Sequence, residues 1–154
     1  MTASLTASDY RALAGFRYEL RRFLHFSEKA ARAAGLEPQQ HQLLLAVKGL
    51  GPGKASIRAI AERLQIEHHS AVELIDRSAR RGLVRRVPAR DDRRRVVIAL
   101  RPPALRVLRR LTLHHREALR QAAPALVSIL RALTRRSSRR TGQPHGDTFA
   151  RSES

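Results

Sequence analysis

The chain has 154 residues, 42% of them hydrophobic, which suits one compact domain with its own core. Its formal net charge of +18 favours a polyanionic partner, with nucleic acid first and an anionic membrane second. The absence of cysteine excludes disulfides, thiolate metal sites and cysteine-based sensing.

A long amphipathic helix is predicted over residues 8–34. Ser8 and Asp9 can cap its N-terminus, and Leu13, Phe16 and Leu20 begin an apolar stripe at helical spacing that lasts until Gly35. So long a stripe in a small protein needs a surface beyond its own domain, so we expect this helix to take part in dimerisation.

A second helix is predicted to begin in the turn containing Pro38 and to end near Lys48. Residues 49–54 form a loop by composition. Its Gly-Lys pair does not make a phosphate-binding loop, because Lys48 stands where the motif requires its first glycine and Ala55 replaces the Ser or Thr.

Two short helices follow, joined by a short link. The first covers residues 56–64, with Ser56 as its N-cap and an apolar stripe through Ile60 and Leu64. The second runs to Arg81 and stops at Gly82. Ser70 and Glu73 form a possible capping box, which would start this second helix at Ser70.

Two β-rich runs, residues 83–87 and 96–100, enclose a turn-forming and mostly positive segment, residues 88–95. Helix, turn, helix and a basic-tipped hairpin is the order of a winged helix-turn-helix. The predicted fold class is therefore mainly α with a small β-hairpin wing (α+β). That architecture puts its second helix in a DNA major groove, with the wing beside it.

Two more apolar helices are predicted after the wing. Pro102 starts one that runs to Gln121, and Pro124 opens another with apolar residues to Leu133. We expect residues 102–134 to join the first helix in dimerisation. Residues 135–154 lack periodicity and are interpreted as a disordered basic tail that adds non-specific attraction to phosphates.

Several of these runs, in this order and spacing, resemble the DNA-binding half of the MarR family. They are Ile60-Ala61-Glu62-Arg63-Leu64, Leu74-Ile75-Asp76-Arg77, Gly82-Leu83-Val84-Arg85-Arg86 and the run from Asp92 to Leu100, preceded by a similar second helix over residues 35–47. The resemblance covers roughly residues 16–133. It implies one domain over residues 1–154, with a winged helix-turn-helix lobe at 37–101. It also implies a homodimeric bacterial transcription regulator, often a repressor that small molecules release.

The resemblance starts the recognition helix about two residues before Ser70, the alternative that we favour. Ala71, Leu74, Ile75 and Ser78 then form its inward stripe. Arginines at the hairpin tip favour phosphate contacts or a narrow minor groove, and the resemblance implies that Arg94 inserts while Asp92 orients it or its neighbour. Val72 could touch a thymine methyl group and Glu73 could accept from a cytosine amino group. The predicted DNA-binding residues are His68, His69, Ser70, Val72, Glu73, Arg77, Arg85, Arg86, Arg90, Asp92, Arg93, Arg94 and Arg95.

The resemblance also implies a cleft for a small aromatic or anionic effector between the dimer helices and the DNA-binding lobe. Its candidate residues are Phe16, Arg17, Phe23, His41 and Leu45, each of which could equally be plain core or surface. No cofactor or metal is expected. Adjacent histidines, as in His68-His69 and His114-His115, point about 100° apart on a helix, and no carboxylate or cysteine cluster completes a site.

We expect the chain not to be an enzyme, because it has no nucleophile motif and no carboxylate pair in apolar surroundings. No apolar run approaches the ~20 residues that cross a membrane, and the N-terminus lacks the features of a signal peptide, which predicts a cytoplasmic location. Two functions remain. One is a homodimeric regulator that binds an inverted-repeat operator in double-stranded DNA. The other is a non-specific DNA-coating or architectural protein, which the charge alone would also support.

Overall fold

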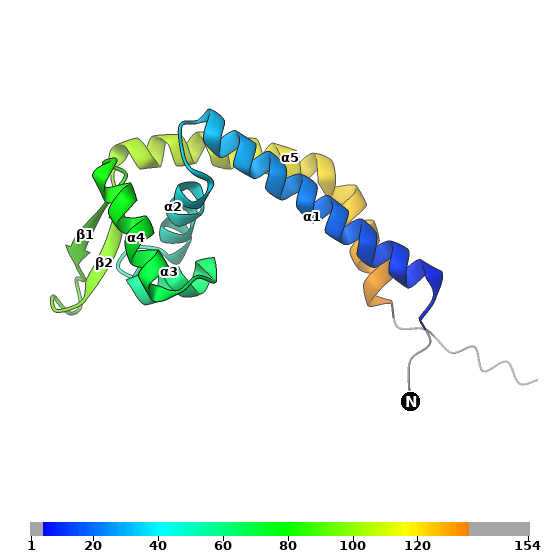
Figure 1. Ribbon diagram of the computed structural model, residues 1–154, viewed down its shortest axis with the longest axis horizontal. Coiled ribbons are helices and arrows are strands. Elements are labelled where there is room, and N and C mark those ends of the chain that lie inside the picture. The colour runs from blue at the N-terminus through cyan, green and yellow to red at the C-terminus, as the bar shows by residue number, and fades with distance from the viewer. Residues whose placement is uncertain (1–4, 136–154) are drawn as a thin grey trace, which may run out of the picture.

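The computed structural model describes residues 5–135. Figure 1 shows a lobe made of α2, α3, α4 and a two-stranded hairpin, and a stem in which α1 and α5 lie side by side. The predicted fold class, mainly helical with a small β wing, is confirmed. In chain order the elements are α1 (Ala7–Ala33), α2 (Pro38–Leu50), α3 (Ile57–Leu64), α4 (His68–Arg80), β1 (Val84–Pro88), β2 (Val96–Leu100) and α5 (Pro102–Thr134).

The N-cap of α1 differs from the prediction. Thr6, not Ser8, caps the helix: its hydroxyl accepts from the Asp9 backbone N–H at 3.3 Å, and the Asp9 carboxylate accepts from the Thr6 N–H at 2.7 Å. This reciprocal capping box satisfies two amide groups at once, whereas a cap at Ser8 would leave the Thr6 pairing unmade. The predicted cap at Ser8 is therefore wrong, although Asp9 does lie in the first turn.

The core of the lobe receives side chains from each of its elements. Ile98 ties β2 to the rest of the lobe through its N–H, which donates to the Ala55 carbonyl at 2.8 Å. The first turns of α5 close this core, so the stem leaves the lobe as a direct continuation of β2. The buried residues include Leu43, Leu44, Ile60, Leu74, Ile75, Val84, Ile98, Ala104, Val107, Leu108 and Leu111.

The helix-turn-helix follows its sequence signals closely. Ser56 caps α3 by accepting from the Ala59 N–H at 3.2 Å, and Gln65 takes a left-handed φ of 52° to end it. The helical bonding of α4 begins at the Glu67 carbonyl, so the helix starts at His68 and the start predicted two residues before Ser70 is confirmed. At the other end Gly82, with φ 70°, turns the chain into the wing.

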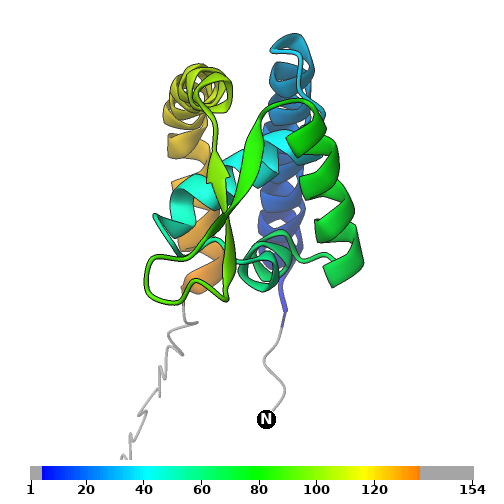
Figure 2. The same cartoon turned by 90° about the vertical axis from the view of Figure 1, so that its left-hand side faces the viewer.

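The wing is an antiparallel pair in which Val84 lies opposite Leu100 and Pro88 opposite Val96. Figure 2 views the molecule from the lobe end, with the hairpin in front. The first strand begins and ends one residue later than the predicted 83–87, and the second strand matches its predicted range.

The two helices predicted after the wing are one. Helix α5 continues through Pro124, so the predicted break there is wrong. A proline inside a helix costs about 3 kcal/mol through its missing N–H and its ring. Here the proline ring is exposed, and the apolar face of α5 continues beyond it. Ile129 packs close to Gly15 of α1, where a Cβ added to the glycine would lie 3.5 Å from Ile129 Cδ1. The packing of α5 on α1 therefore offsets the cost and holds the helix together.

Within residues 5–135, no helix is long and apolar enough to cross a membrane, and no three His, Asp or Glu side chains gather into a cluster that could hold a metal ion. The predicted tail lies outside the described residues, apart from Arg135, the C-cap of α5.

Candidate nucleic-acid interface

Helix α4 has the buried face and the exposed face that the sequence predicted for it. Ala71, Leu74, Ile75 and Ser78 are buried against the lobe, as predicted. His68, His69 and Glu73 are exposed, whereas Ser70 and Val72 are half-buried beside them. The N-terminal half of α4 therefore exposes polar side chains on the side away from the core.

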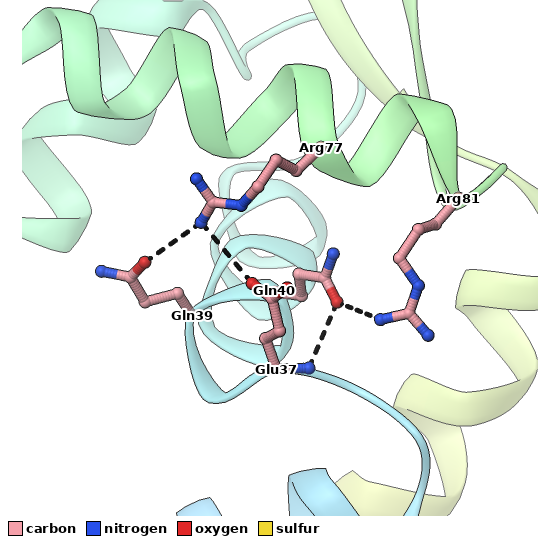
Figure 3. Close-up of polar contacts among 5 residues, drawn as sticks. All are labelled: Glu37, Gln39, Gln40, Arg77 and Arg81. Carbon is pink, nitrogen blue, oxygen red and sulfur yellow. Dashed lines mark hydrogen bonds and ion pairs between the residues drawn. The ribbon is translucent and has the colours of Figure 1, made fainter.

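Arg77 has a partner that the sequence did not indicate. Its guanidinium lies 3.5 Å from the Glu37 carboxylate and 3.4 Å from the Gln39 side-chain oxygen, both at the start of α2 (Figure 3). In this structure the predicted DNA-binding Arg77 thus holds α4 against α2.

Arg81, one turn further along, makes a second connection to the same place. Its guanidinium donates to Gln40 Oε1 and, at 2.6 Å, to the Gly35 carbonyl (Figure 3). Gln40 is fully buried, and its Oε1 also accepts from the Glu37 N–H at 3.2 Å, which caps α2. The sequence did not predict this pair. The only signal was a glutamine on the buried side of α2.

The carboxylates of the wing organise its backbone. The Asp92 side chain accepts from the Arg94 N–H at 3.0 Å, and the Asp92 carbonyl accepts from the Arg95 N–H at 3.0 Å. Asp91 forms an ion pair with Arg95 at 2.8 Å. The turn is therefore fixed by its own aspartates, and Arg95 is largely neutralised by its partner.

Three wing arginines are left to face solvent. Arg90, Arg93 and Arg94 are exposed, and within the described part of the chain none of them forms an ion pair. At the base of the hairpin Arg85 is exposed, while Arg86 pairs with Asp76 of α4 at 2.8 Å. This last pair joins the wing directly to the helix beside it.

The start of α4 and the loop of the wing lie at the same end of the lobe, the lower edge in Figure 2. This end of the lobe thus presents both an exposed helix end and a projecting loop with three arginines. This surface can meet a polyanion with its cationic loop while the helix lies against it.

The candidate effector residues do not all come together. Phe23 and His41 both lie against His115 of α5, with ring centroids 5.8 and 4.8 Å away. Phe16 is half-buried and Arg17 exposed, both further towards the start of α1. Leu45 lines a separate hollow on the side of α3.

His115 is the centre of the cluster that does form. Its Nδ1–H donates to the Leu111 carbonyl at 2.6 Å, and its Nε2 lies 2.7 Å from the Ser27 hydroxyl. Phe26 packs edge-on at 5.3 Å. His114 is exposed and His115 is half-buried, in keeping with the angle of about 100° between adjacent helical residues, but no local signal in the sequence predicts the contacts of His115 with Ser27 and Phe26.

His41 is buried within this junction of α1, α2 and α5. Burial first, and then the nearby imidazole of His115, lower the pKa of His41 below its usual 6.5. The junction therefore favours a neutral His41 and gives the three helices a shared aromatic contact.

Residues 34–95 match the model of the MarR family. A search of curated protein sequences finds no match. Among solved structures, the chain is similar to AbsC, a MarR family transcriptional regulator from Streptomyces coelicolor, at 23% identity and a TM-score of 0.66, over 86% of this chain and 94% of that one.

Two further structures have the same fold at lower identity. One is a mutant of S. aureus MepR bound to an oligodeoxyribonucleotide (18% identity, TM-score 0.59, over 79% of this chain and 84% of that one). The other is Bordetella bronchiseptica BpsR, whose DNA binding is regulated by 6-hydroxynicotinic acid (20%, 0.57, over 76% and 86%). Together, these comparisons show that residues 34–95 match the MarR family and that the chain has the winged helix-turn-helix fold of the transcriptional regulators in that family.

Proposed function

We propose that the protein is a homodimeric repressor that binds an inverted-repeat operator in double-stranded DNA and is released by a small aromatic anion. Each subunit lays the start of α4 in a major groove and the wing in the neighbouring minor groove. Two-fold symmetry then sets the half-sites about one helical turn apart, on the order of 10 bp.

The observation that carries this proposal is the construction of the wing. Its aspartates are used on the backbone and on Arg95, so Arg90, Arg93 and Arg94 project without an acidic partner in the described residues. A narrow minor groove has a strong negative potential and attracts arginine in particular. A merely solvated turn would gain nothing from three exposed guanidinium groups that have no acidic partner in the described residues.

The dimer is supported by the exposed apolar side chains of the stem. Among the described residues, most large exposed hydrophobic side chains lie on α1 and α5, including Leu13, Leu20, Leu24, Leu105, Leu119 and Leu130. In the described monomer these side chains face water. A second copy of the stem would cover them and would place two lobes side by side.

Release by an effector is supported by the aromatic junction around His115. It lies where α1, α2 and α5 meet, and α2 in turn holds α4 through Arg77 and Arg81. BpsR, which shares the fold, responds to 6-hydroxynicotinic acid, a small aromatic anion. An effector that separates these helices would therefore move the recognition helix.

Fluorescence anisotropy with the promoter DNA of its own gene and with a scrambled duplex, over a salt series, tests the proposal. A preference of ~10³ or more near physiological salt is expected for a specific regulator. Arg94→Ala should weaken binding to both duplexes and lower the salt slope by about 0.9, whereas Glu73→Ala should change the preferred base.

Arg11→Ala, an exposed arginine at the far end of the stem, is the matched control and should leave operator binding unchanged. Equal binding to both duplexes at every salt concentration would favour the second function, a DNA-coating protein. If Arg94→Ala binds as tightly as the unmodified protein at moderate salt, the wing does not contact DNA.

A further inference from the structure

The outer face of α5 is a second cationic surface that the wing and recognition helix do not use. Successive residues of an α-helix rotate by about 100°, and on this basis all of the arginines of α5 and its C-cap fall within an arc of about 120°. All of them are exposed, and the same segment contains one acidic residue, Glu117. The members of this arginine stripe are Arg106, Arg109, Arg110, Arg116, Arg120, Arg131 and Arg135.

The stripe lies opposite the side of α5 that packs. Ala104, Val107, Leu108 and Leu111 are buried on the far side of the helix. The exposed leucines that the proposed dimer would cover, Leu105, Leu119 and Leu130, lie between the buried side and the stripe. A dimer built on those leucines therefore leaves the arginines facing outwards.

The arginine stripe contains a surface depression at Pro124. A depression of about 480 Å³ opens there, with a floor of small and apolar side chains such as Ala123 and Val127 and with Arg120, Arg131 and Arg135 around it. Within the described residues only Arg120 of the stripe has an acidic partner, Glu117, at a long 3.6 Å. Three arginines around one depression, of which only Arg120 has an acidic partner in the described residues, suit an anion such as a phosphate group.

The position and length of the stripe identify the anion. From Arg106 to Arg135 the helix extends about 44 Å, which matches the length of about 13 base pairs of B-DNA, a little more than one turn of the duplex. Its distal half lies far from the wing and α4 (Figure 1), so it cannot belong to the contact of the same subunit's lobe with its operator. An amphipathic helix that binds lipid needs its apolar face for the bilayer. The apolar side chains of α5 either pack on α1 or would be covered by the second copy in the proposed dimer.

We propose that the arginine stripe of α5 binds the phosphate backbone of a second DNA duplex, so that the protein bridges two segments of double-stranded DNA. The contact reads no sequence, because it involves phosphates alone. The bridging of two duplexes rests on the proposed binding of DNA by the lobe. The binding of DNA by the arginine stripe does not depend on it.

The test is a capture assay with the full chain. Promoter DNA of its own gene is immobilised and saturated with protein, and a labelled duplex of unrelated sequence is then added over a salt series. The unmodified protein should retain the second duplex. The triple variant Arg120→Gln, Arg131→Gln, Arg135→Gln should bind the first duplex as before but retain about 10-fold less of the second, with a salt slope lower by about 2 to 3.

The matched control is Arg11→Gln, Arg21→Gln, Lys29→Gln, which removes the same charge from exposed positions of α1 and should capture as the unmodified protein does. Equal capture by the triple variant, or loss of capture in both variants alike, would overturn the proposal. Stripe-dependent binding to vesicles of anionic phospholipid without capture of DNA would also overturn it, in favour of a membrane surface. Circular dichroism melting of both variants checks that each is folded.

Failure of the proposed function has a different signature. If Arg94→Ala leaves binding of the first duplex unchanged, then the lobe assignment is wrong. The dependence of second-duplex capture on the arginine stripe is measured separately and is decided by the triple variant alone.

Discussion

His41 is hard to protonate because its ring is buried and faces the ring of His115. A pKa that is lower in the folded than in the unfolded state means that the unfolded chain binds more protons, so stability rises with pH. The contribution is complete above the unfolded value of 6.5 and is lost as the pH falls from there towards the lowered pKa of the folded state.

We therefore expect urea denaturation at fixed protein concentration to give a lower free energy of unfolding at about pH 5.5 than at about pH 7.5. His41→Gln should flatten this dependence, while His25→Gln, at an exposed position of α1, should leave it in place. An unchanged pH dependence in His41→Gln would mean that other groups cause it.

Ser78 is a polar residue in a fully buried position. It is fully buried on α4, and its hydroxyl has no hydrogen-bond partner among the described residues. An unpaired buried hydroxyl costs about 1–3 kcal/mol, so Ser78→Ala should raise the free energy of unfolding by about 1 kcal/mol. Ser70→Ala, half-buried on the same helix, controls for the higher helix propensity of alanine. A gain no larger than that of the control would show that the Ser78 hydroxyl finds a partner in solution.

At the scale of elements, α4 is fixed along its length by different means. Its middle packs through apolar side chains, while its C-terminal end is held to α2 by the two bonds of Arg81. Hydrogen bonds from a charged donor contribute about 1.5–3 kcal/mol each when buried and less when exposed. Because Arg81 is exposed, we expect Arg81→Ala to lower the free energy of unfolding by about 1–2 kcal/mol.

Arg80→Ala is the control for that variant. Arg80 is the preceding residue, is exposed, and makes no ion pair or side-chain hydrogen bond within residues 5–135, so its replacement should change stability by less than about 0.5 kcal/mol. Equal effects of the two variants in urea denaturation would show that the Arg81 contacts do not hold α4.

The elements show why the sequence predicts some features and not others. The start of α3, the inward stripe of α4 and the hairpin follow from caps, periodicity and turn residues, which are local signals. The continuity of α5 through Pro124 does not, because it depends on packing against α1, which is distant in the sequence. The same reason hides the partners of Arg77, Arg81 and His115, since each contact joins helices far apart in the chain.

At the scale of the whole molecule, packing within a single chain does not account for the apolar surface of the stem. Helix α1 packs on α5 along one face only, and large apolar side chains such as Leu24 and Leu130, 49% and 45% exposed, remain open to water. A surface of this kind on an otherwise charged stem indicates a partner, and a second copy is the one that the proposed function requires.

The double variant Leu24→Glu, Leu130→Glu tests this requirement. Charges placed in a buried apolar interface are costly, so the variant should sediment as a monomer at concentrations where the unmodified protein is a dimer. Two linked lobes bind an inverted repeat with an effective concentration that separate lobes lack, so operator affinity should fall by roughly 10²-fold or more. Leu45→Glu, on α2 and 49% exposed, should stay dimeric. If the double variant is still dimeric, then the dimer interface does not lie on these residues of the stem. The spacing of the operator half-sites would then have to be derived from another surface.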